Sequence, residues 1–114
     1  MASVFLVEDE VLIRMMVADM VTELGHTVAC EAGDLPSALE HANDAAFDLA
    51  VLDVQLGRDS IAPVANVLAH RNVPFAFATG YGAEGVPKEF SGRPWLQKPF
   101  QIEQLERCIA QLLP

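Results

Sequence analysis

Short apolar runs alternate along this chain with longer segments in which apolar residues recur every three or four positions. Short apolar runs that end in polar or turn residues are typical of buried β-strands. Apolar residues three or four positions apart are typical of amphipathic helices. When strand and helix alternate in this way, the strands form a parallel sheet and the helices cover both of its faces. The pattern therefore predicts an α/β domain.

We expect five strands, each followed by a helix. The segment 80–92, between the fourth and fifth strands, contains four glycines and a proline, so any helix there should be short and mobile. The other helices are indicated by Ile13, Met16, Met20 and Leu24; by Leu35 to Ala46; by Ile61, Val64, Ala65 and Leu68; and by Ile102, Leu105, Ile109 and Leu112. The expected strands are residues 3–7, 27–32, 49–52, 74–79 and 95–97.

The second strand differs from the others because polar and apolar residues alternate from Thr27 to Ala32. Val28, Cys30 and Ala32 would face inward while Thr27 and Glu31 face outward, which suits a strand at the edge of the sheet. With right-handed crossovers, this edge position favours the strand order 2-1-3-4-5. That order is the flavodoxin-like (βα)5 doubly wound fold. The length of 114 residues fits one domain, residues 1–114.

Composition and charge exclude several classes of protein. Hydrophobic residues make up 52% of the chain, which is typical of folded domains and not of disordered chains. The net charge of −9 argues against direct nucleic-acid binding, because phosphate contacts need clustered lysines and arginines. No apolar stretch is long enough to cross a bilayer and no signal-peptide pattern is present, so we expect a cytoplasmic protein without membrane contact. Cys30 and Cys108 are expected to be reduced thiols.

Side chains with reactive or charged groups stand at the ends of four of the expected strands. Glu8 and Asp9 follow the first strand, Asp53 follows the third, Thr79 ends the fourth, and Lys98 follows the fifth. Because the carboxyl ends of parallel strands meet at one edge of the sheet, these residues should converge on one crevice. Taken singly, each has a plainer interpretation as a helix cap, a turn or a strand residue. Their joint placement favours a functional site.

The chemistry of this set points to phosphoryl transfer. Clustered carboxylates repel one another unless they are protonated or neutralised, and Mg²⁺ suits a site with a few carboxylates that also binds phosphate oxygens. Lys98 adds a compact positive charge and Thr79 a hydroxyl, and such groups stabilise a phosphoryl group during its transfer. Asp53 would act as the nucleophile and form an acyl phosphate.

Across essentially its whole length the sequence resembles the response-regulator receiver family of two-component signalling. Val7-Glu8-Asp9-Glu10 resembles the acidic pair of that family, and Leu52-Asp53-Val54 resembles its phosphoacceptor segment. Thr79 matches the switch hydroxyl, and Lys98-Pro99 matches the Lys-Pro pair. The run Phe77-Ala78-Thr79-Gly80-Tyr81 resembles the "FAT GUY" subgroup, found in alphaproteobacterial receivers that often stand alone.

The resemblance implies that Asp53 accepts a phosphoryl group from a histidine kinase or phosphotransfer protein. It implies Mg²⁺ on Glu8, Asp9 and Asp53, with the backbone carbonyl of Gln55 as a further ligand. Thr79 and Lys98 would bind the incoming phosphoryl group, helped by the backbone amides of Val54 and Gly80. The protein would then be a signalling domain that switches its contacts with a downstream protein, and not an enzyme, although phosphotransfer and dephosphorylation at Asp53 would be self-catalysed.

Three positions depart from the family pattern or bear on the switch. Gly57 stands where most receivers have a proline, so this loop should be more mobile. Trp95 stands where the family has a Tyr or Phe that turns inward on phosphorylation, and the alternative for this larger ring is packing on the surface. We also expect Trp95 to lie near the site, so that Mg²⁺ changes its fluorescence. Tyr81 and Gln55 occupy positions that tune dephosphorylation in the family, and Tyr81 would shield the acyl phosphate from water.

Three other functions compete with this interpretation. Gly80-Tyr81-Gly82-Ala83-Glu84-Gly85 has the form of a dinucleotide-binding fingerprint, but it follows the fourth strand instead of the first. An aspartyl-phosphate phosphatase of the haloacid dehalogenase type needs a second aspartate where this chain has Gln55. A receiver-like interaction module that is never phosphorylated is the third, and intact Asp53, Thr79 and Lys98 argue against it. The chain is expected to be either a stand-alone receiver or a domain of a larger protein.

Overall fold

Five parallel strands form the central sheet of the computed structural model, which describes all 114 residues. The strand order is β2-β1-β3-β6-β7, which confirms the predicted order 2-1-3-4-5 when only the strands of this sheet are counted. The predicted α/β class and flavodoxin-like topology are therefore confirmed. The strands are β1 (Ser3–Val7), β2 (Thr27–Ala32), β3 (Leu49–Asp53), β6 (Phe75–Thr79) and β7 (Trp95–Gln97).

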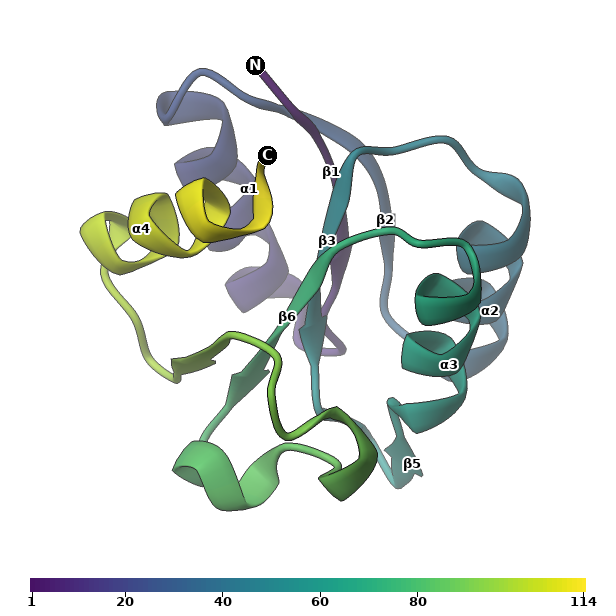
Figure 1. Cartoon of the computed structure of the whole chain (residues 1–114). Coiled ribbons are helices and arrows are strands. Elements are labelled where there is room, and N and C mark those ends of the chain that lie inside the picture. Colours follow the sequence, from purple (N-terminus) through teal and green to yellow (C-terminus); the bar gives the residue numbers. More distant parts are fainter.

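Helices cover both faces of the sheet (Figure 1). On one face lie α1 (Val11–Glu23) and α4 (Ile102–Leu112), and on the other lie α2 (Leu35–Asp44) and α3 (Ala62–His70). The start of α2 is stabilised by Asp34, whose side chain accepts a hydrogen bond from the Ser37 N–H at 2.8 Å. None of these helices combines the length and the apolar character needed to cross a membrane.

The core is divided by the sheet into two layers. One layer packs under α2 and α3 around Phe5, Phe75 and Phe77, and the other packs under α1 and α4 around Leu6, Leu49 and Leu105. Strands β3 and β6 are buried along their whole length, as continuous apolar runs require. Strand β2 alternates between exposed and more buried residues, which confirms its predicted place at the edge.

Helix α1 lies where the sequence predicts it, and Ile13, Met20 and Leu24 of its predicted stripe pack against the core, but Met16 does not. The buried residues are Val17 and Val21, whereas Met16, which belongs to the predicted stripe, is 58% exposed. Val11, Leu12 and Met15 are exposed as well. The first half of α1 is apolar on both its inner and outer sides, so apolar spacing alone did not exclude Met16 from the side that packs on the sheet.

Between β6 and β7 the chain forms two short 3₁₀-helices, η1 (Gly82–Gly85) and η2 (Lys88–Phe90), and no α-helix. This confirms that helical structure there is short, as the glycines and Pro87 predict. The segment stays attached to the sheet through Phe90, whose ring centroid lies 5.6 Å from that of Phe75 and 6.0 Å from that of Phe77.

A small antiparallel hairpin after β3 was not predicted. Its strands are β4 (Gln55–Leu56) and β5 (Asp59–Ser60), and Gly57 in the turn has a φ of +61°. Glycine adopts this left-handed conformation without the steric cost that a Cβ brings. Strands of two residues are too short to leave a periodic pattern in the sequence.

Candidate functional site

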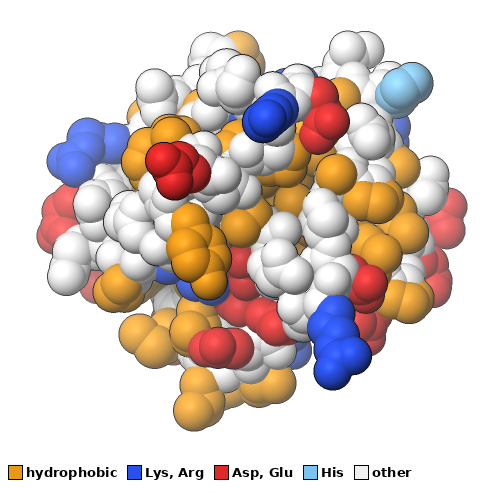
Figure 2. Space-filling model, turned by 90° about the horizontal axis from the view of Figure 1, so that it is seen from below, with side chains coloured by type: hydrophobic (Ala, Val, Ile, Leu, Met, Phe, Trp, Pro, Cys, Tyr) orange, Lys and Arg blue, Asp and Glu red, His pale blue; other side chains and the backbone are white.

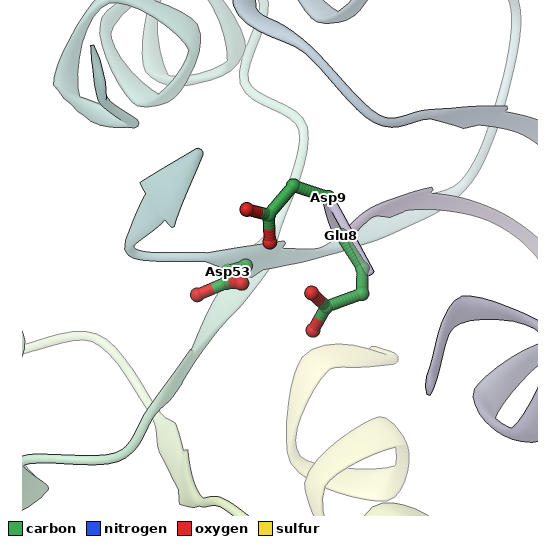
Figure 3. A group of neighbouring side chains, drawn as sticks. All are labelled: Glu8, Asp9 and Asp53. Atoms are coloured by element: carbon green, nitrogen blue, oxygen red, sulfur yellow. The ribbon is translucent and has the colours of Figure 1, made fainter. Parts of the chain in front are cut away.

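The acidic residues predicted to converge do meet at the carboxyl edge of the sheet. Glu8 and Asp9 follow β1, and Asp53 ends β3, which is the neighbour of β1. Figure 3 shows the three carboxylates facing a common point, and one oxygen from each lies within 4.8 Å of the others. Glu8 and Asp53 are only 6% and 7% exposed. Glu8 and Asp53 are thus held close together with little water to separate their charges, whereas Asp9 is exposed to solvent.

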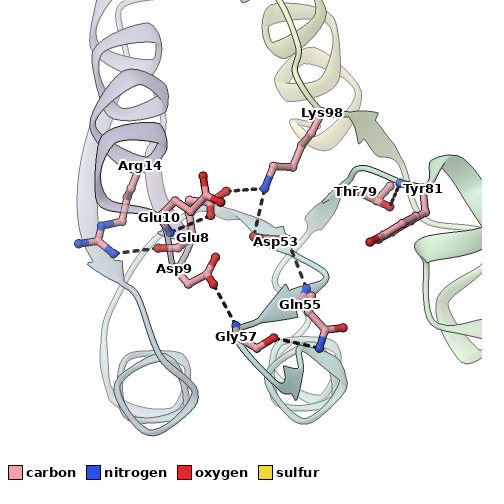
Figure 4. A network of polar contacts seen from close by, with 10 residues as sticks. All are labelled: Glu8, Asp9, Glu10, Arg14, Asp53, Gln55, Gly57, Thr79, Tyr81 and Lys98. Atoms are coloured by element: carbon pink, nitrogen blue, oxygen red, sulfur yellow. Dashed lines mark hydrogen bonds and ion pairs between the residues drawn. The ribbon is translucent and has the colours of Figure 1, made fainter.

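Lys98 is the positive charge that holds this group together. Its Nζ lies 2.8 Å from Glu8 Oε1 and 3.2 Å from Asp53 Oδ2 (Figure 4). The lysine is positioned by its own backbone, because the Lys98 N–H donates to the Thr79 carbonyl at 2.8 Å and so continues the pairing of β7 with β6. The structure thus brings Lys98 together with Glu8 and Asp53.

Burial and the neighbouring charges together raise the pKa values of both Glu8 and Lys98. Burial raises the pKa of Glu8 above its ordinary value, the charge of Asp53 adds to the rise, and the hydrogen bond from Lys98 only partly opposes it. Burial alone would lower the pKa of Lys98, but its hydrogen bond to Glu8 and the charge of Asp53 outweigh burial and raise it. One ammonium therefore offsets part of the repulsion, and the crevice retains excess negative charge.

Asp9 is held by the hairpin after β3. The Gly57 N–H donates to Asp9 Oδ2 at 3.0 Å, and the Gln55 side-chain amide donates to the Gly57 carbonyl at 3.1 Å. Burial acts to raise the pKa of Asp9, but the interactions with Glu8 and with the Gly57 N–H, together with the charge of Lys98, lower it overall. A proline at position 57 would have no N–H to give to Asp9. The departure from the family pattern thus creates a contact with a predicted metal ligand.

Arg14 fixes the backbone beside the acids, and sequence reasoning missed it. Its Nη1 donates to the Glu8 carbonyl at 2.8 Å, and its Nε lies 3.2 Å from Glu31 Oε1. The guanidinium passes over Gly33, where an added Cβ would overlap Nη1. Arg14 stands in α1 and Gly33 follows β2, so no local sequence pattern connects the two residues.

Thr79 ends β6 as predicted, but its hydroxyl is turned away from the acids. The side chain is fully buried, and its Oγ1 accepts a hydrogen bond from the Tyr81 N–H at 3.0 Å (Figure 4). No hydrogen bond joins it to Asp53 or Lys98. The predicted role of Thr79 in phosphoryl binding therefore requires the hydroxyl to move.

Backbone amides differ in their availability for a phosphoryl group. The Val54 N–H donates to the Ala78 carbonyl at 3.1 Å. This hydrogen bond must break before the amide can donate to a phosphoryl group as predicted. The Gln55 N–H instead faces Asp53 and lies 3.3 Å from its Oδ1. The Gly80 N–H has no partner within the protein. Gly80 therefore offers a free donor at this edge of the sheet.

These residues line an open crevice of about 380 Å³ at the carboxyl end of the sheet. Figure 2 looks onto this end of the molecule and shows acidic side chains gathered in a hollow, with hydrophobic side chains along its margin. The walls include Asp9, Asp53, Gln55, Gly80 and Lys98, but not Thr79. A crevice of this size and charge accommodates a small anionic group once its acids are neutralised.

The two aromatic residues near the crevice are exposed to different degrees. Tyr81 is 78% exposed and lines the crevice, whereas Trp95 is 40% exposed and does not. The Trp95 ring lies beside Gly82, where an added Cβ would be 4.0 Å from Cη2. Its half-exposed position matches the alternative of packing on the surface, and the fluorescence response to Mg²⁺ stays a prediction.

The glycine-rich segment does not fit a dinucleotide. Such a fingerprint needs a full α-helix whose N-terminus faces the pyrophosphate, whereas Gly82–Gly85 is a single short 3₁₀ turn. The fingerprint interpretation therefore fails on geometry.

Comparisons with known proteins agree with the fold. The sequence model of the response regulator receiver domain matches residues 4–110. The transcriptional regulatory protein PdtaR of Mycobacterium tuberculosis is 33% identical over 110 residues, which cover 93% of this chain and 54% of PdtaR. The chain thus spans about half the length of this curated relative.

Solved structures of receiver domains resemble the whole chain. SdrG from Sphingomonas melonis Fr1 has a TM-score of 0.87 and 39% identity, and the match covers 100% of this chain and 98% of SdrG. The PhyR receiver domain of Erythrobacter litoralis has a TM-score of 0.82 and 31% identity, covering 97% of this chain and 88% of the other. With these matches and the acidic site at the carboxyl edge, the chain belongs to the response regulator receiver domain family of two-component signalling.

Proposed function

We propose that this chain is a phosphoacceptor of a cytoplasmic two-component phosphorelay, in which Asp53 takes a phosphoryl group from a histidine kinase or phosphotransfer protein. The observation that carries the proposal is the buried Asp53 carboxylate, which lies in the crevice bonded to Lys98 and beside Glu8 and Asp9. Single acids at strand ends are common, whereas three clustered acids with a lysine bonded to two of them, beside an open crevice, are what phosphoryl transfer needs.

In the proposed step, an oxygen of Asp53 attacks the phosphorus of a phosphohistidine. The new oxygen–phosphorus bond forms as the nitrogen–phosphorus bond breaks, and the electron pair of that bond stays on the imidazole nitrogen, which takes up a proton. Lys98 exchanges its contact with Asp53 Oδ2 for a phosphoryl oxygen, which keeps its charge next to the group that carries the negative charge. The free Gly80 N–H donates to a second phosphoryl oxygen.

The residues present fit a bound Mg²⁺. Three carboxylates supply oxygen ligands within 4.8 Å of one another, and the single ammonium of Lys98 does not balance their charge. Glu8, Asp9 and Asp53 would hold the ion, with the backbone carbonyl of Gln55 as a further ligand. When bound, the ion neutralises charge that develops on the phosphoryl oxygens. Gln55 and Tyr81 line the same crevice, which supports a role for them in the access of water to the acyl phosphate.

The phosphodonor needs a surface beside the crevice on which to dock. The exposed apolar residues of α1 start two positions after Asp9 and include Val11, Leu12, Met15 and Met16. A cavity of about 280 Å³ lies between α1 and the segment that follows Lys98, and its walls are mainly apolar. An exposed apolar patch next to a reactive site is typical of a protein-binding surface. We place the donor protein on this face of α1.

The test is the intact mass of the protein after incubation with acetyl phosphate and Mg²⁺. We expect one added phosphoryl group that is labile to base, and we expect Asp53→Asn to abolish it. Asp59→Asn is the matched control, because Asp59 is an exposed aspartate on the neighbouring hairpin. An unchanged mass of the wild-type protein under saturating donor, from either acetyl phosphate or a kinase, would refute the proposal.

A further inference from the structure

The pattern Gly80-x-Gly82-x-x-Gly85 is left unexplained by the metal and phosphoryl chemistry, and its glycines have different environments. A Cβ added at Gly80 would meet no atom within 4 Å. Gly82 has a φ of +62°, so its backbone conformation favours glycine. Gly85 has no such φ, but a Cβ added there would overlap the hydroxyl oxygen of Thr79. Gly85 is therefore required for space and not for backbone conformation.

The space over Gly85 holds the withdrawn hydroxyl of Thr79. The Tyr81 N–H donates to Thr79 Oγ1 at 3.0 Å, and the turn of η1 brings Gly85 back over the same oxygen. A Cβ at position 85 would also lie 3.1 Å from Thr79 Cβ and 3.5 Å from Tyr81 Cβ. The chain from Thr79 to Gly85 thus forms a closed seat for one hydroxyl group.

We infer that Gly85 is a positioning residue that lets the Thr79 hydroxyl rest in its seat, away from Asp53. The inference rests on the proposed function, in which this hydroxyl must leave the seat to bind the phosphoryl group. The Thr79 hydroxyl is then in equilibrium between the seat and the position in which it binds the phosphoryl group. The stability of the seated position sets how readily the domain responds to phosphorylation. A side chain at position 85 removes the seated position.

Rotation of the Thr79 side chain relieves the overlap with Oγ1 and is less costly than moving η1 away, whereas the 3.1 Å approach to Thr79 Cβ is unchanged by rotation and needs only a slight shift of the backbone. Threonine has discrete staggered χ1 positions, and the one that turns its β-hydrogen toward Gly85 takes the hydroxyl out of the seat in one step. Movement of η1 would instead disturb the buried Val86, whose N–H donates to the Ala83 carbonyl at 3.2 Å, and the packing of Phe90. A methyl group at position 85 should therefore turn Thr79 and displace η1 only slightly.

The first experiment uses the unphosphorylated full chain. We expect NMR couplings of the labelled Thr79 side chain to show a different χ1 in Gly85→Ala, and the Tyr81 amide to exchange with solvent faster because its acceptor has left. Gly92→Ala is the matched control, since an added Cβ at Gly92 meets no atom within 4 Å and its φ is not left-handed. A shift of the Gly82–Val86 amides with an unchanged Thr79 χ1 would overturn the inference.

The second experiment measures binding of beryllofluoride, a phosphoryl mimic, in the presence of Mg²⁺. Loss of the hydrogen bond that stabilises the seated hydroxyl should raise the affinity of Gly85→Ala roughly fivefold over the wild type, the factor that corresponds to one net hydrogen bond. An affinity equal to or below that of wild type overturns the inference. If the wild type binds no beryllofluoride, the proposed function fails, whereas the χ1 measurement still decides where the hydroxyl rests.

A double variant covers the case in which Gly85→Ala does not fold. Thr79→Ala removes the oxygen that the new methyl group meets, so Gly85→Ala combined with Thr79→Ala should fold if that contact is the cause. Recovery of cooperative unfolding in the double variant supports the inference that Gly85 leaves space for the Thr79 hydroxyl. A double variant that remains unfolded overturns it.

Discussion

Lys98 illustrates how one side chain stabilises an arrangement that would otherwise repel itself. Its ammonium contacts Glu8 and Asp53, whose side chains are each 8% exposed. Removing one partner of a buried ion pair leaves the remaining charges without compensation, which costs more than an exposed pair contributes. The side chain of Lys98 is itself 21% exposed, so water screens part of this effect.

We therefore predict that Lys98→Met lowers the free energy of unfolding by about 1–3 kcal/mol in the absence of divalent ions. Millimolar Mg²⁺ should restore more stability to this variant than to the wild type, because a dication can replace the missing charge. Urea unfolding with and without Mg²⁺ measures both effects. Lys88→Met removes an exposed lysine of η2 and should change neither value. Equal stability of Lys98→Met and wild type without Mg²⁺ contradicts the prediction.

At the scale of elements, the hairpin of β4 and β5 connects the loop after Asp53 to the acidic pair. Its turn places the Gly57 N–H on Asp9, and the turn requires a left-handed backbone at Gly57. An Ala in this conformation keeps the N–H but introduces a Cβ that the conformation disfavours. The turn of the hairpin thus needs glycine at position 57 for its backbone conformation, and its contact with Asp9 needs the N–H of that residue.

We predict that Gly57→Ala lowers the free energy of unfolding by about 1 kcal/mol, the usual cost of a left-handed Cβ. Since an added Cβ at Gly57 meets no atom within 4 Å, the cost comes from the backbone and not from a clash. Gly92→Ala, also in open space but without a left-handed φ, should be neutral or slightly stabilising. Urea unfolding compares the two variants, and a Gly57→Ala protein as stable as Gly92→Ala would contradict the argument.

Helix α4 places the thiol of Cys108 in the core, and ionisation of this thiol would destabilise the folded protein. Burial raises the pKa of Cys108 to about 11, whereas a thiol in the unfolded chain ionises near its ordinary value of about 8.5. As the pH rises through this interval the unfolded chain loses the proton first. The stability that the neutral thiol provides is therefore fully present below the pKa of the thiol in the unfolded chain. It is lost as the pH rises toward the pKa of Cys108 in the folded protein.

We predict that between pH 8 and pH 10.5 the wild type loses about 2 kcal/mol more unfolding free energy than Cys108→Val, which has no thiol at this position. Urea unfolding at a series of pH values measures the difference. The half-buried Cys30 also has a pKa raised by burial, but its greater exposure should make the corresponding Cys30→Val difference smaller. Parallel pH profiles of wild type and Cys108→Val would rule out the effect.

At the scale of the whole molecule, the crevice and the exposed face of α1 lie side by side, which separates two requirements of phosphorylation. A small donor needs only the crevice, whereas a protein donor also needs a surface to dock on. Leu12 is 76% exposed in α1, and it does not line the crevice. A substitution of Leu12 should therefore slow phosphorylation by a protein donor and leave phosphorylation by a small donor unchanged.

We predict that Leu12→Gln slows phosphorylation by a protein donor about tenfold, because truncating an anchor residue of an interface costs more than about 1 kcal/mol and tenfold corresponds to about 1.4 kcal/mol. The rate with acetyl phosphate should not change. Mass spectrometry of time courses with both donors provides the measurement, and Glu40→Gln on α2, at the opposite face of the sheet, provides the control. Equal slowing with both donors would show that the effect arises in the crevice and not in docking.

The order of the elements and the position of the site could be predicted from the sequence because both depend on local patterns and on topology. Apolar runs identified β1, β3 and β6, and the alternation in β2 identified the edge strand. Once the sheet is parallel, strand ends meet whatever the details of packing, which is why Glu8, Asp9, Asp53 and Lys98 were predicted to lie together.

Only the tertiary structure decided how individual side chains are oriented. The withdrawn hydroxyl of Thr79 depends on Gly85, and Arg14 reaches the Glu8 carbonyl across the space left by Gly33. The outward position of Met16 depends on which side of α1 packs on the sheet. Such features arise from contacts between residues distant in the chain, and these contacts leave no periodic trace in the sequence. The sequence by itself thus determined which groups meet at the crevice, and the folded chain determined which of them point into it.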